Sequence, residues 1–148
     1  YQTTRLAGAN VETRQDVLMI NKSNISFERK IVAIFEDDPT IFQAYTKLLN
    51  QQGCNIISLS ENFDEISQQL ATIDRIDCIL SDFRLKHTTG DQIIQFLRES
   101  FGTDIPAIIV TADTSPDHIQ LFNELNIVVL YKPIGYDEIV NQIKLLAH

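Results

Sequence analysis

Residues 31–40 read IVAIFEDDPT, an apolar run that ends in acidic residues and then in a proline. Such a continuous apolar run is typical of a parallel strand covered by helices on both faces. Asp38 followed by Pro39 is a typical helix start, because the carboxylate can cap free N–H groups and proline fits the first helical position. The stretch therefore predicts a buried strand that turns directly into a helix, with acidic side chains at the turn.

The alternation of an apolar run with a helical pattern occurs five times from Ile31 onward. We expect strands over residues 31–36, 54–59, 76–81, 105–111 and 127–131. Helices are expected from Asp38-Pro39, from about Glu61, from a Thr89-to-Gln92 capping box, from a Ser115-Pro116 cap, and after Gly135. Five such units predict an α/β fold, a doubly wound parallel sheet with five helices.

Polar side chains gather where these strands end. Ligands of doubly wound sheets bind at the carboxyl ends of the strands. The residues expected there are Glu36, Asp37, Asp82 and Thr111, and Lys132 directly follows the last strand. Carboxylates that face one another repel, so a cation or a reaction must justify the cluster. Asp38 alone is better explained as a helix cap.

The composition argues against a nucleic-acid-binding protein and against a membrane-spanning one. Residues 1–30 carry five basic and three acidic side chains, whereas residues 31–148 carry seven and seventeen, a net charge of −10. Such an acidic surface repels nucleic acid. No apolar run approaches the ~20 residues of a membrane-spanning helix. The two cysteines, Cys54 and Cys78, lie in apolar runs and are expected to be reduced core residues of a cytoplasmic domain.

The chain divides into residues 1–30, expected to be a linker or N-terminal extension, and a folded domain over residues 31–148. The first part is polar except for an apolar patch at residues 17–20, which could dock on the domain. Because the sequence begins with Tyr1 rather than methionine, we expect a fragment of a longer protein.

Four motifs in order then identify a family. They are an acidic pair after the first strand, Asp82 after the third, Thr111-Ala112 after the fourth, and Lys132-Pro133 after the fifth. Together they resemble the receiver domain of two-component response regulators, over residues 31 to about 147. The resemblance implies a flavodoxin-like sheet with strand order 2-1-3-4-5.

The resemblance also implies the roles of the site residues. Asp82 would be the phosphoacceptor, with Lys132 and Thr111 contacting the phosphoryl group. Mg²⁺ or Mn²⁺ would be the cofactor, and its ligands would be Glu36, Asp37, Asp82 and the backbone carbonyl of Arg84. The Lys132-Pro133 bond is expected to be cis. The family also implies that phosphorylation draws Thr111 and Lys132 toward the new oxygens and moves the loop from Thr111 to Pro116.

Two stretches are similar to receivers at the C-terminus of hybrid sensor histidine kinases, namely residues 80–85 (LSDFRL) and residues 110–116 (VTADTSP). The implied function is a phosphorelay step with Mg²⁺-dependent self-phosphorylation and dephosphorylation, in a polypeptide whose kinase domain is absent from this sequence. The implied partners are a sensor histidine kinase, a histidine phosphotransfer protein, or both. The domain is expected in the cytoplasm, either free or tethered to a membrane sensor kinase. A dimer would form through the fourth helix, the fifth strand and the fifth helix.

Some positions depart from the family pattern. Glu36 replaces a more frequent Asp, and Val129 stands where most receivers carry a switching aromatic residue. We hypothesise that Arg84 and Asp113 pair across the site and shield the acyl phosphate from water. The three histidines, His87, His118 and His148, are expected to be solvated surface residues.

Two alternatives use similar residues. A phosphohydrolase of the haloacid dehalogenase type also combines a sheet-end Asp with Mg²⁺, Thr and Lys, but it needs Asp-x-Asp on its first strand, and Pro39 interrupts that pattern here. A degenerate receiver would serve only as a protein-interaction module. Retention of every reactive residue type weighs against the second alternative.

Overall fold

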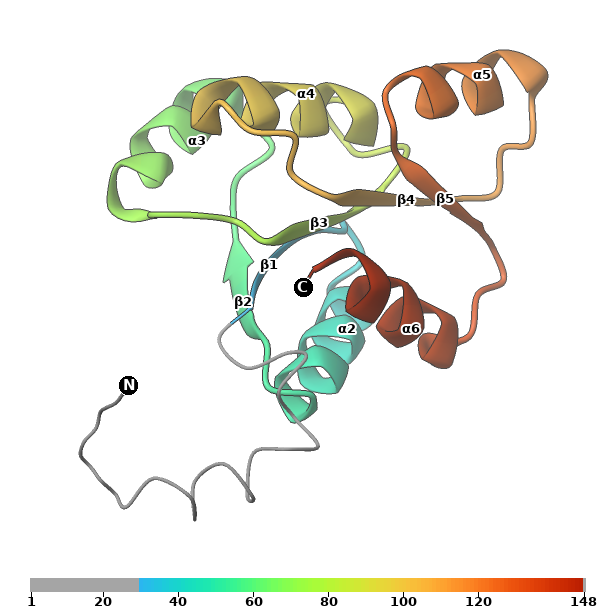
Figure 1. Ribbon diagram of the computed structural model, residues 1–148, viewed down its shortest axis with the longest axis horizontal. Helices are drawn as coiled ribbons and strands as arrows, with labels where there is room; N and C mark the ends of the chain where they lie inside the picture. Colours follow the sequence, from blue (N-terminus) through green and yellow to red (C-terminus); the bar gives the residue numbers. More distant parts are fainter. Residues whose placement is uncertain (1–29, 148) are drawn as a thin grey trace, which may run out of the picture.

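The computed structural model describes residues 30–147, in which strands and helices alternate along the chain (Figure 1). The strands are all parallel and follow the order β2-β1-β3-β4-β5, so the predicted doubly wound sheet is confirmed. The strands are β1 (Ile31–Phe35), β2 (Asn55–Ser58), β3 (Cys78–Asp82), β4 (Ala107–Thr111) and β5 (Val128–Tyr131). The helices are α2 (Pro39–Gln51), α3 (Phe63–Gln69), α4 (Gly90–Phe101), α5 (Pro116–Glu124) and α6 (Tyr136–Leu146), and a short 3₁₀ turn, η2 (Leu70–Thr72), follows α3.

The three central strands are the most apolar and the most buried. Every residue of β4 is buried, and β1 and β3 each have one partly exposed residue, whereas the edge strands β2 and β5 are largely exposed or half-buried. Several predicted strands began one or two residues too early, as at Ile76 and Ile105. These side chains are buried, although they precede the paired residues. An apolar run thus marks burial rather than strand pairing.

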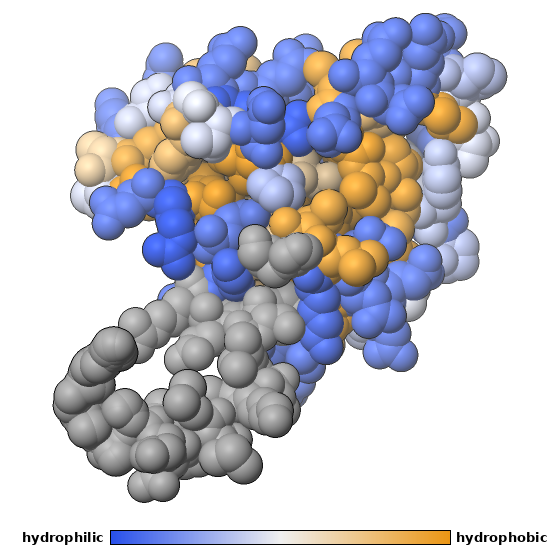
Figure 2. Space-filling model, viewed as in Figure 1, coloured by the Kyte–Doolittle hydropathy of each residue, from blue (hydrophilic) through white to orange (hydrophobic). Residues whose placement is uncertain are grey.

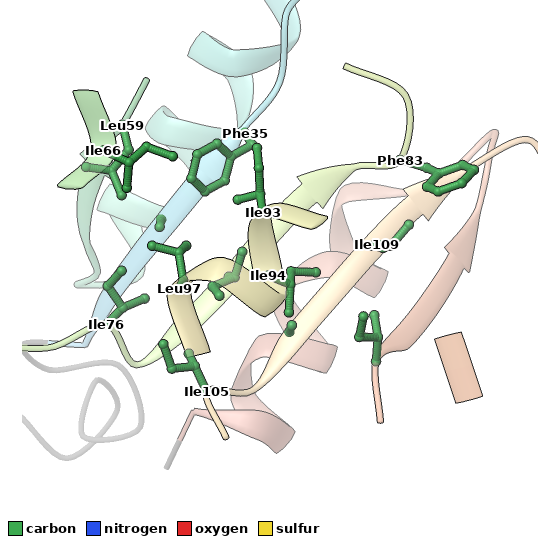
Figure 3. Close-up of a cluster of buried hydrophobic side chains, with 14 of the residues drawn as sticks. Phe35, Leu59, Ile66, Ile76, Phe83, Ile93, Ile94, Leu97, Ile105 and Ile109 are labelled. Atoms are coloured by element: carbon green, nitrogen blue, oxygen red, sulfur yellow. The ribbon is translucent and has the colours of Figure 1, made fainter. Parts of the chain in front are cut away.

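Helices cover both faces of the sheet, and each face has its own core (Figure 1). The helices α2 and α6 pack on one face, where Tyr45, Leu49, Ile139 and Ile143 meet the strands. On the other face α3, α4 and α5 enclose the cluster drawn in Figure 3, in which Ile66, Ile93 and Leu97 lie over the sheet. Cys54 and Cys78 are free and buried in the first core, as predicted.

The helix starts follow the sequence pattern only in part. Asp38 caps α2 as predicted, since its side chain accepts hydrogen bonds from the N–H groups of Thr40 and Ile41. The capping box predicted at Thr89 is wrong, because the Thr89 side chain makes no cap hydrogen bond. The hydroxyl of Ser115 likewise caps nothing, and contacts a histidine instead.

The predicted segment 1–30 lies outside the described residues except for Lys30, as does His148, so the division at residue 30 stays a prediction. Within residues 30–147, no helix has the length and apolar character that crossing a membrane would require. On the side of the molecule drawn in Figure 2, apolar side chains are visible over β5 and α6. Leu145 of α6 is 65% exposed.

Candidate functional site

The strand register brings the polar ends of four strands to one edge of the sheet. Phe35 pairs with Ser81 and Asp82 pairs with Val110, so Glu36, Asp82 and Thr111 follow one another across neighbouring strands. The backbone N–H of Lys132 donates to the carbonyl of Thr111 at 2.9 Å, which places Lys132 beside the same edge. The topology therefore gathers residues that are up to 96 positions apart in the sequence, from Glu36 to Lys132.

Asp82 is the last residue of β3, and its side chain is only 15% exposed. Its Oδ1 atom accepts a hydrogen bond from the N–H of Phe83 at 3.1 Å and lies 3.0 Å from Nζ of Lys132. Among the described residues, no hydrogen bond reaches the other carboxylate oxygen, Oδ2. The carboxylate is thus held through one oxygen and leaves the second available for bonding to another group.

A glycine makes room beside this carboxylate. Gly90 begins α4, and its N–H donates to the carbonyl of Phe83 at 2.7 Å. A Cβ atom at position 90 would lie 2.5 Å from the backbone oxygen of Asp82 and 2.7 Å from Oγ of Ser81, which is closer than such contacts allow. Glycine therefore lets α4 begin directly against the end of β3.

Lys132 and Thr111 lie on the far side of Asp82 from β1. The Lys132-Pro133 peptide bond is cis, and the Lys132 side chain is 39% exposed. Thr111 is buried, with 4% of its surface exposed, and its Oγ1 accepts a hydrogen bond from the N–H of Asp113 at 3.0 Å. The Thr111 hydroxyl is therefore already tied to the loop that follows β4.

Like charges meet on the β1 side of Asp82. Burial raises the pKa of Glu36, the N–H of Asp38 opposes this by donating to Oε2 of Glu36, and the neighbouring Asp82 carboxylate raises the pKa further. Lys132 lowers this pKa in turn. Glu36 and Asp82 thus lie close enough to share one electrostatic site.

Asp37 is turned toward a residue that the sequence did not single out, Glu61 at the start of the segment leading into α3. Burial raises the pKa of Glu61, and a hydrogen bond and repulsion from Asp37 raise it further. The N–H of His87 also donates to Oε1 of Glu61 at 3.4 Å. These three residues line a cleft of about 690 Å³ beside the site, together with Ser60, Glu65 and Lys86.

Within residues 30–147, no three His, Cys, Asp or Glu side chains are arranged as a finished metal site. The chemistry of the donors nevertheless fits Mg²⁺, which prefers a few carboxylate oxygens and retained waters. The Arg84 carbonyl is also available, because the bridge between Arg84 and Thr89 uses the backbone groups of Phe83, Leu85, Thr88 and Gly90. Glu36 and Asp82 interact electrostatically, but Asp37 contacts Glu61 in this arrangement, so the four predicted ligands do not form a finished set here.

Arg84 and Asp113 form an ion pair, as hypothesised from the sequence, and join the loop after β3 to the loop after β4. Nη2 of Arg84 lies 2.8 Å from Oδ2 of Asp113, and the guanidinium lies 5.0 Å from the centre of the Phe83 ring. The backbone N–H of Ser115, followed by the side chains of Ser115, His118 and Arg84, holds the pKa of Asp113 well below its usual range. Asp113 is therefore ionised, and its carboxylate connects the loop after β3 with the loop after β4.

The prediction of a solvated surface position holds only in part for His118, which is half-buried. Its side chain is 32% exposed, Nδ1 lies 2.8 Å from Oδ2 of Asp113, and the ring packs edge-on against Phe83 at 4.8 Å. The residues that contact His118 lie on two loops and one helix, so no local sequence pattern indicated these contacts. His87 is exposed as expected, and only its backbone N–H contacts Glu61.

Tyr45 of α2 is a second residue beside the site that no sequence motif singled out. It is 5% exposed and packs edge-on against Tyr136 of α6, with ring centres 6.1 Å apart. Burial raises the pKa of Tyr45 to about 12, and the charges of Glu36 and Asp82 add to this rise. The phenol therefore lies within the electric field of the acidic site.

The site has two flanks that differ in their bonding. The acidic flank lies on the β1 and β2 side of Asp82, where carboxylates face one another, and it consists of Glu36, Asp37 and Glu61. The paired flank lies on the β4 and β5 side, where side chains are joined by hydrogen bonds, and it consists of Arg84, Thr111, Asp113 and His118.

Comparison with known proteins gives one family. The family described as response regulator receiver domain matches residues 32–144. No curated protein matches the chain in sequence.

Solved structures share the fold at low sequence identity. The Vibrio cholerae chemotaxis protein CheY4 is 20% identical, with a TM-score of 0.66, and the match covers 80% of this chain and 98% of that one. A CheY-like receiver domain protein from Methanospirillum hungatei is 17% identical, with a TM-score of 0.68, and covers 80% and 93%. The HemR receiver domain from Leptospira biflexa is 18% identical, with a TM-score of 0.68, and covers 80% and 94%.

Proposed function

Because the chain belongs to the family of response regulator receiver domains, which accept a phosphoryl group in two-component signalling, we propose that Asp82 accepts this group in a Mg²⁺-dependent reaction. The observation that carries the proposal is the environment of the Asp82 carboxylate. One oxygen is held by Lys132 and by the N–H of Phe83, and the other has no hydrogen bond among the described residues. A nucleophile held in this way is oriented without being blocked.

The transfer is a displacement at phosphorus. Oδ2 of Asp82 attacks the phosphoryl group of a phosphohistidine, a bond forms between this oxygen and phosphorus, and the bond from phosphorus to the histidine nitrogen breaks. The released imidazole takes up a proton from solvent. Phosphoryl transfer depends mainly on positioning and on neutralising the negative oxygens, and Lys132 supplies a positive charge 3.0 Å from the nucleophilic carboxylate.

The residues proposed to hold Mg²⁺ are Glu36, Asp37, Asp82 and the carbonyl of Arg84. The ion, when bound, supplies positive charge that offsets the phosphoryl oxygens. Two like charges ~4 Å apart cost about 4 kcal/mol at an effective dielectric of ~20. Burial and then the Asp82 carboxylate raise the pKa of Glu36, so a positive charge bound here would favour its ionised form. Mn²⁺, with similar oxygen preferences, is expected to substitute.

The switch in this proposal begins at Thr111. Phosphorylation adds about −1.5 to −2 charges and three acceptor oxygens. The Thr111 hydroxyl then turns to donate to a phosphoryl oxygen, and its oxygen is already bonded to the N–H of Asp113, so the loop that follows β4 moves with it. Couplings of this kind are typically ~1–3 kcal/mol, enough to shift a population of conformations.

Receiver domains work with histidine kinases or histidine phosphotransfer proteins, and we infer that this chain relays its phosphoryl group to or from such a protein. The motifs in residues 80–85 and 110–116 support an origin in a hybrid histidine kinase. A dimer through α5, β5 and α6 is supported by the exposed side chains of Ile119, Tyr131 and Leu145. The acidic charge of residues 31–148 argues against direct binding of nucleic acid.

One experiment separates this function from its alternatives. The protein is incubated with acetyl phosphate, with and without Mg²⁺, and any added phosphoryl group is located by mass spectrometry in the wild type and in Asp82→Asn. A slowly decaying adduct at Asp82 that requires Mg²⁺ is the expected result. Rapid turnover without an adduct would indicate a haloacid-dehalogenase-like hydrolase, and the absence of both adduct and turnover would indicate a degenerate interaction module.

A further inference from the structure

His118 lies in the first turn of α5 and makes two kinds of contact. Its Nδ1 atom lies 2.8 Å from Oδ2 of Asp113 and 2.9 Å from Oγ of Ser115. Its ring lies edge-on to Phe83 and is stacked with Phe122 at a centre-to-centre distance of 6.2 Å. The ring is therefore fixed on its apolar sides while one nitrogen is aimed at the loop that follows β4.

The contact with Asp113 determines where a hydrogen lies. An ionised carboxylate can only accept hydrogen bonds, so a nitrogen 2.8 Å from Oδ2 must carry a hydrogen. Nδ1 of His118 is therefore a donor, whether or not the other ring nitrogen is protonated. Packing against Phe83 leaves the ring little freedom to turn this donor away from Asp113.

Asp113 links His118 to two residues near the phosphoacceptor, Arg84 and Thr111. The Oδ2 atom that His118 contacts also accepts the hydrogen bond from Nη2 of Arg84 at 2.8 Å. The backbone N–H of the same residue donates to Oγ1 of Thr111. The Arg84 side chain is 67% exposed and its guanidinium also lies 5.0 Å from the centre of the Phe83 ring, so the bond to Asp113 is its main polar restraint. Anchoring Asp113 therefore anchors the ion pair that crosses the opening of the site.

We propose that His118 is a positioning residue that holds Asp113, and through it Arg84, across the mouth of the acceptor site, and so lengthens the life of the aspartyl phosphate. The proposal rests on the proposed function of Asp82. The step that it slows is hydrolysis: a water oxygen attacks phosphorus, the bond between phosphorus and the Asp82 oxygen breaks, and inorganic phosphate leaves. One proton of the water stays on the phosphate, and the other passes to solvent.

The test measures decay of the phosphorylated protein after the phosphodonor is removed, with Mg²⁺ present throughout. His118→Phe keeps the ring packing against Phe83 and Phe122 but removes the donor, and is expected to speed decay about threefold to tenfold, as the loss of one exposed ionic contact would. His118→Asn places an amide N–H near the position of Nδ1 and should stay within about twofold of the wild type. Thermal unfolding of each variant checks that the fold is intact.

A double-mutant cycle separates positioning from general loosening of the fold. In an Asp113→Ala background, His118→Phe is expected to change the decay rate no further, because the contact is already gone. Should His118→Phe fold poorly, His118→Leu against His118→Asn makes the same comparison. Decay at the wild-type rate in His118→Phe, or equal acceleration with and without the Asp113 carboxylate, overturns the proposal while leaving Asp82 as acceptor. If the wild type forms no adduct at Asp82, the proposed function fails and this inference fails with it.

Discussion

The acidic flank and the paired flank lie on opposite sides of the Asp82 carboxylate, and they differ in how their side chains are bonded. On the paired flank, the single carboxylate of Asp113 accepts three hydrogen bonds, from Arg84, Ser115 and His118. On the acidic flank, Asp37 and Glu61 face each other, and burial, followed by this contact, raises the pKa of Glu61. One flank joins unlike groups by hydrogen bonds, whereas the other brings carboxyl groups together and is expected to gain stability when a cation binds.

The difference indicates a division of labour around Asp82. A flank whose hydrogen bonds are already made can hold its shape before any ligand arrives, which is the condition for precise positioning. A flank of facing carboxylates costs folding free energy, and this cost is recovered only when positive charge binds. The acidic flank is therefore where the chain is expected to respond to metal, and the paired flank is where it is expected to respond to phosphorylation.

The largest effect is expected from Lys132, which contacts Asp82 from the side of the paired flank. Lys132→Gln removes the positive charge 3.0 Å from Oδ1 of Asp82, and should slow phosphorylation by acetyl phosphate about a hundredfold, the cost of losing one well-placed electrostatic contact at a reaction centre. The rate is measured by mass spectrometry at saturating Mg²⁺. Lys86→Gln, a matched change in the cleft on the acidic flank, is expected to leave the rate within about threefold. Equal losses in the two variants would refute the special place of Lys132.

Glu36→Gln tests whether the acidic flank is repulsive without metal. Glutamine keeps an oxygen for the N–H of Asp38 but removes the charge that faces Asp82. In metal-free buffer the variant should be more stable to urea, by up to about 1 kcal/mol, the usual size of one partly exposed charge contact, and Mg²⁺ should stabilise it less than the wild type. Glu99→Gln on the exposed side of α4 is the control. A less stable variant in metal-free buffer would contradict the description of this flank.

Tyr45 gives a smaller effect, confined to alkaline pH. Burial, aided by the charges of Glu36 and Asp82, raises the pKa of Tyr45 from 10.0 to about 12, so the unfolded chain loses this proton first. The stabilising contribution is complete below pH 10 and is lost as pH rises toward 12, for a total of about 2–3 kcal/mol. Urea unfolding at pH 8 and pH 11 should show a smaller loss of stability in Tyr45→Phe than in the wild type. Equal losses in the two proteins would show that Tyr45 is not buried beside the acidic site.

The fold could be predicted because its signals are local. An apolar run in the sequence indicated each strand. The helix start at Asp38-Pro39 depends only on neighbouring backbone N–H groups, and the structure shows that the Asp38 side chain accepts hydrogen bonds from them. The same holds for the polar residues at strand ends, since a parallel sheet places all carboxyl ends at one edge. The amino-acid sequence alone was therefore sufficient to place Asp82, Thr111 and Lys132 together.

The parts that could not be predicted depend on contacts between loops. Nothing near Asp37 in the sequence indicates that its side chain lies against Glu61. His118 contacts Asp113 and Phe83 only after α5 has packed beside β5 and against the loop that follows β3. The two hydroxyls expected to cap helices failed for a related reason. Ser115 turns to His118 instead, and Thr89 makes no cap hydrogen bond. Short polar side chains choose among several partners, and tertiary packing decides the choice.

The most direct test of this division follows backbone amide signals by NMR while ligands are added in two steps. Mg²⁺ alone is predicted to shift the amides of residues 36–38, 61, 82–85 and 87, which include its proposed ligands, and to leave residues 111–118 nearly unchanged. Acetyl phosphate, added next, is predicted to shift residues 111–118 together with residues 82–84. Mg²⁺ that perturbs both flanks alike, or that leaves residues 36–38 untouched, would contradict the account.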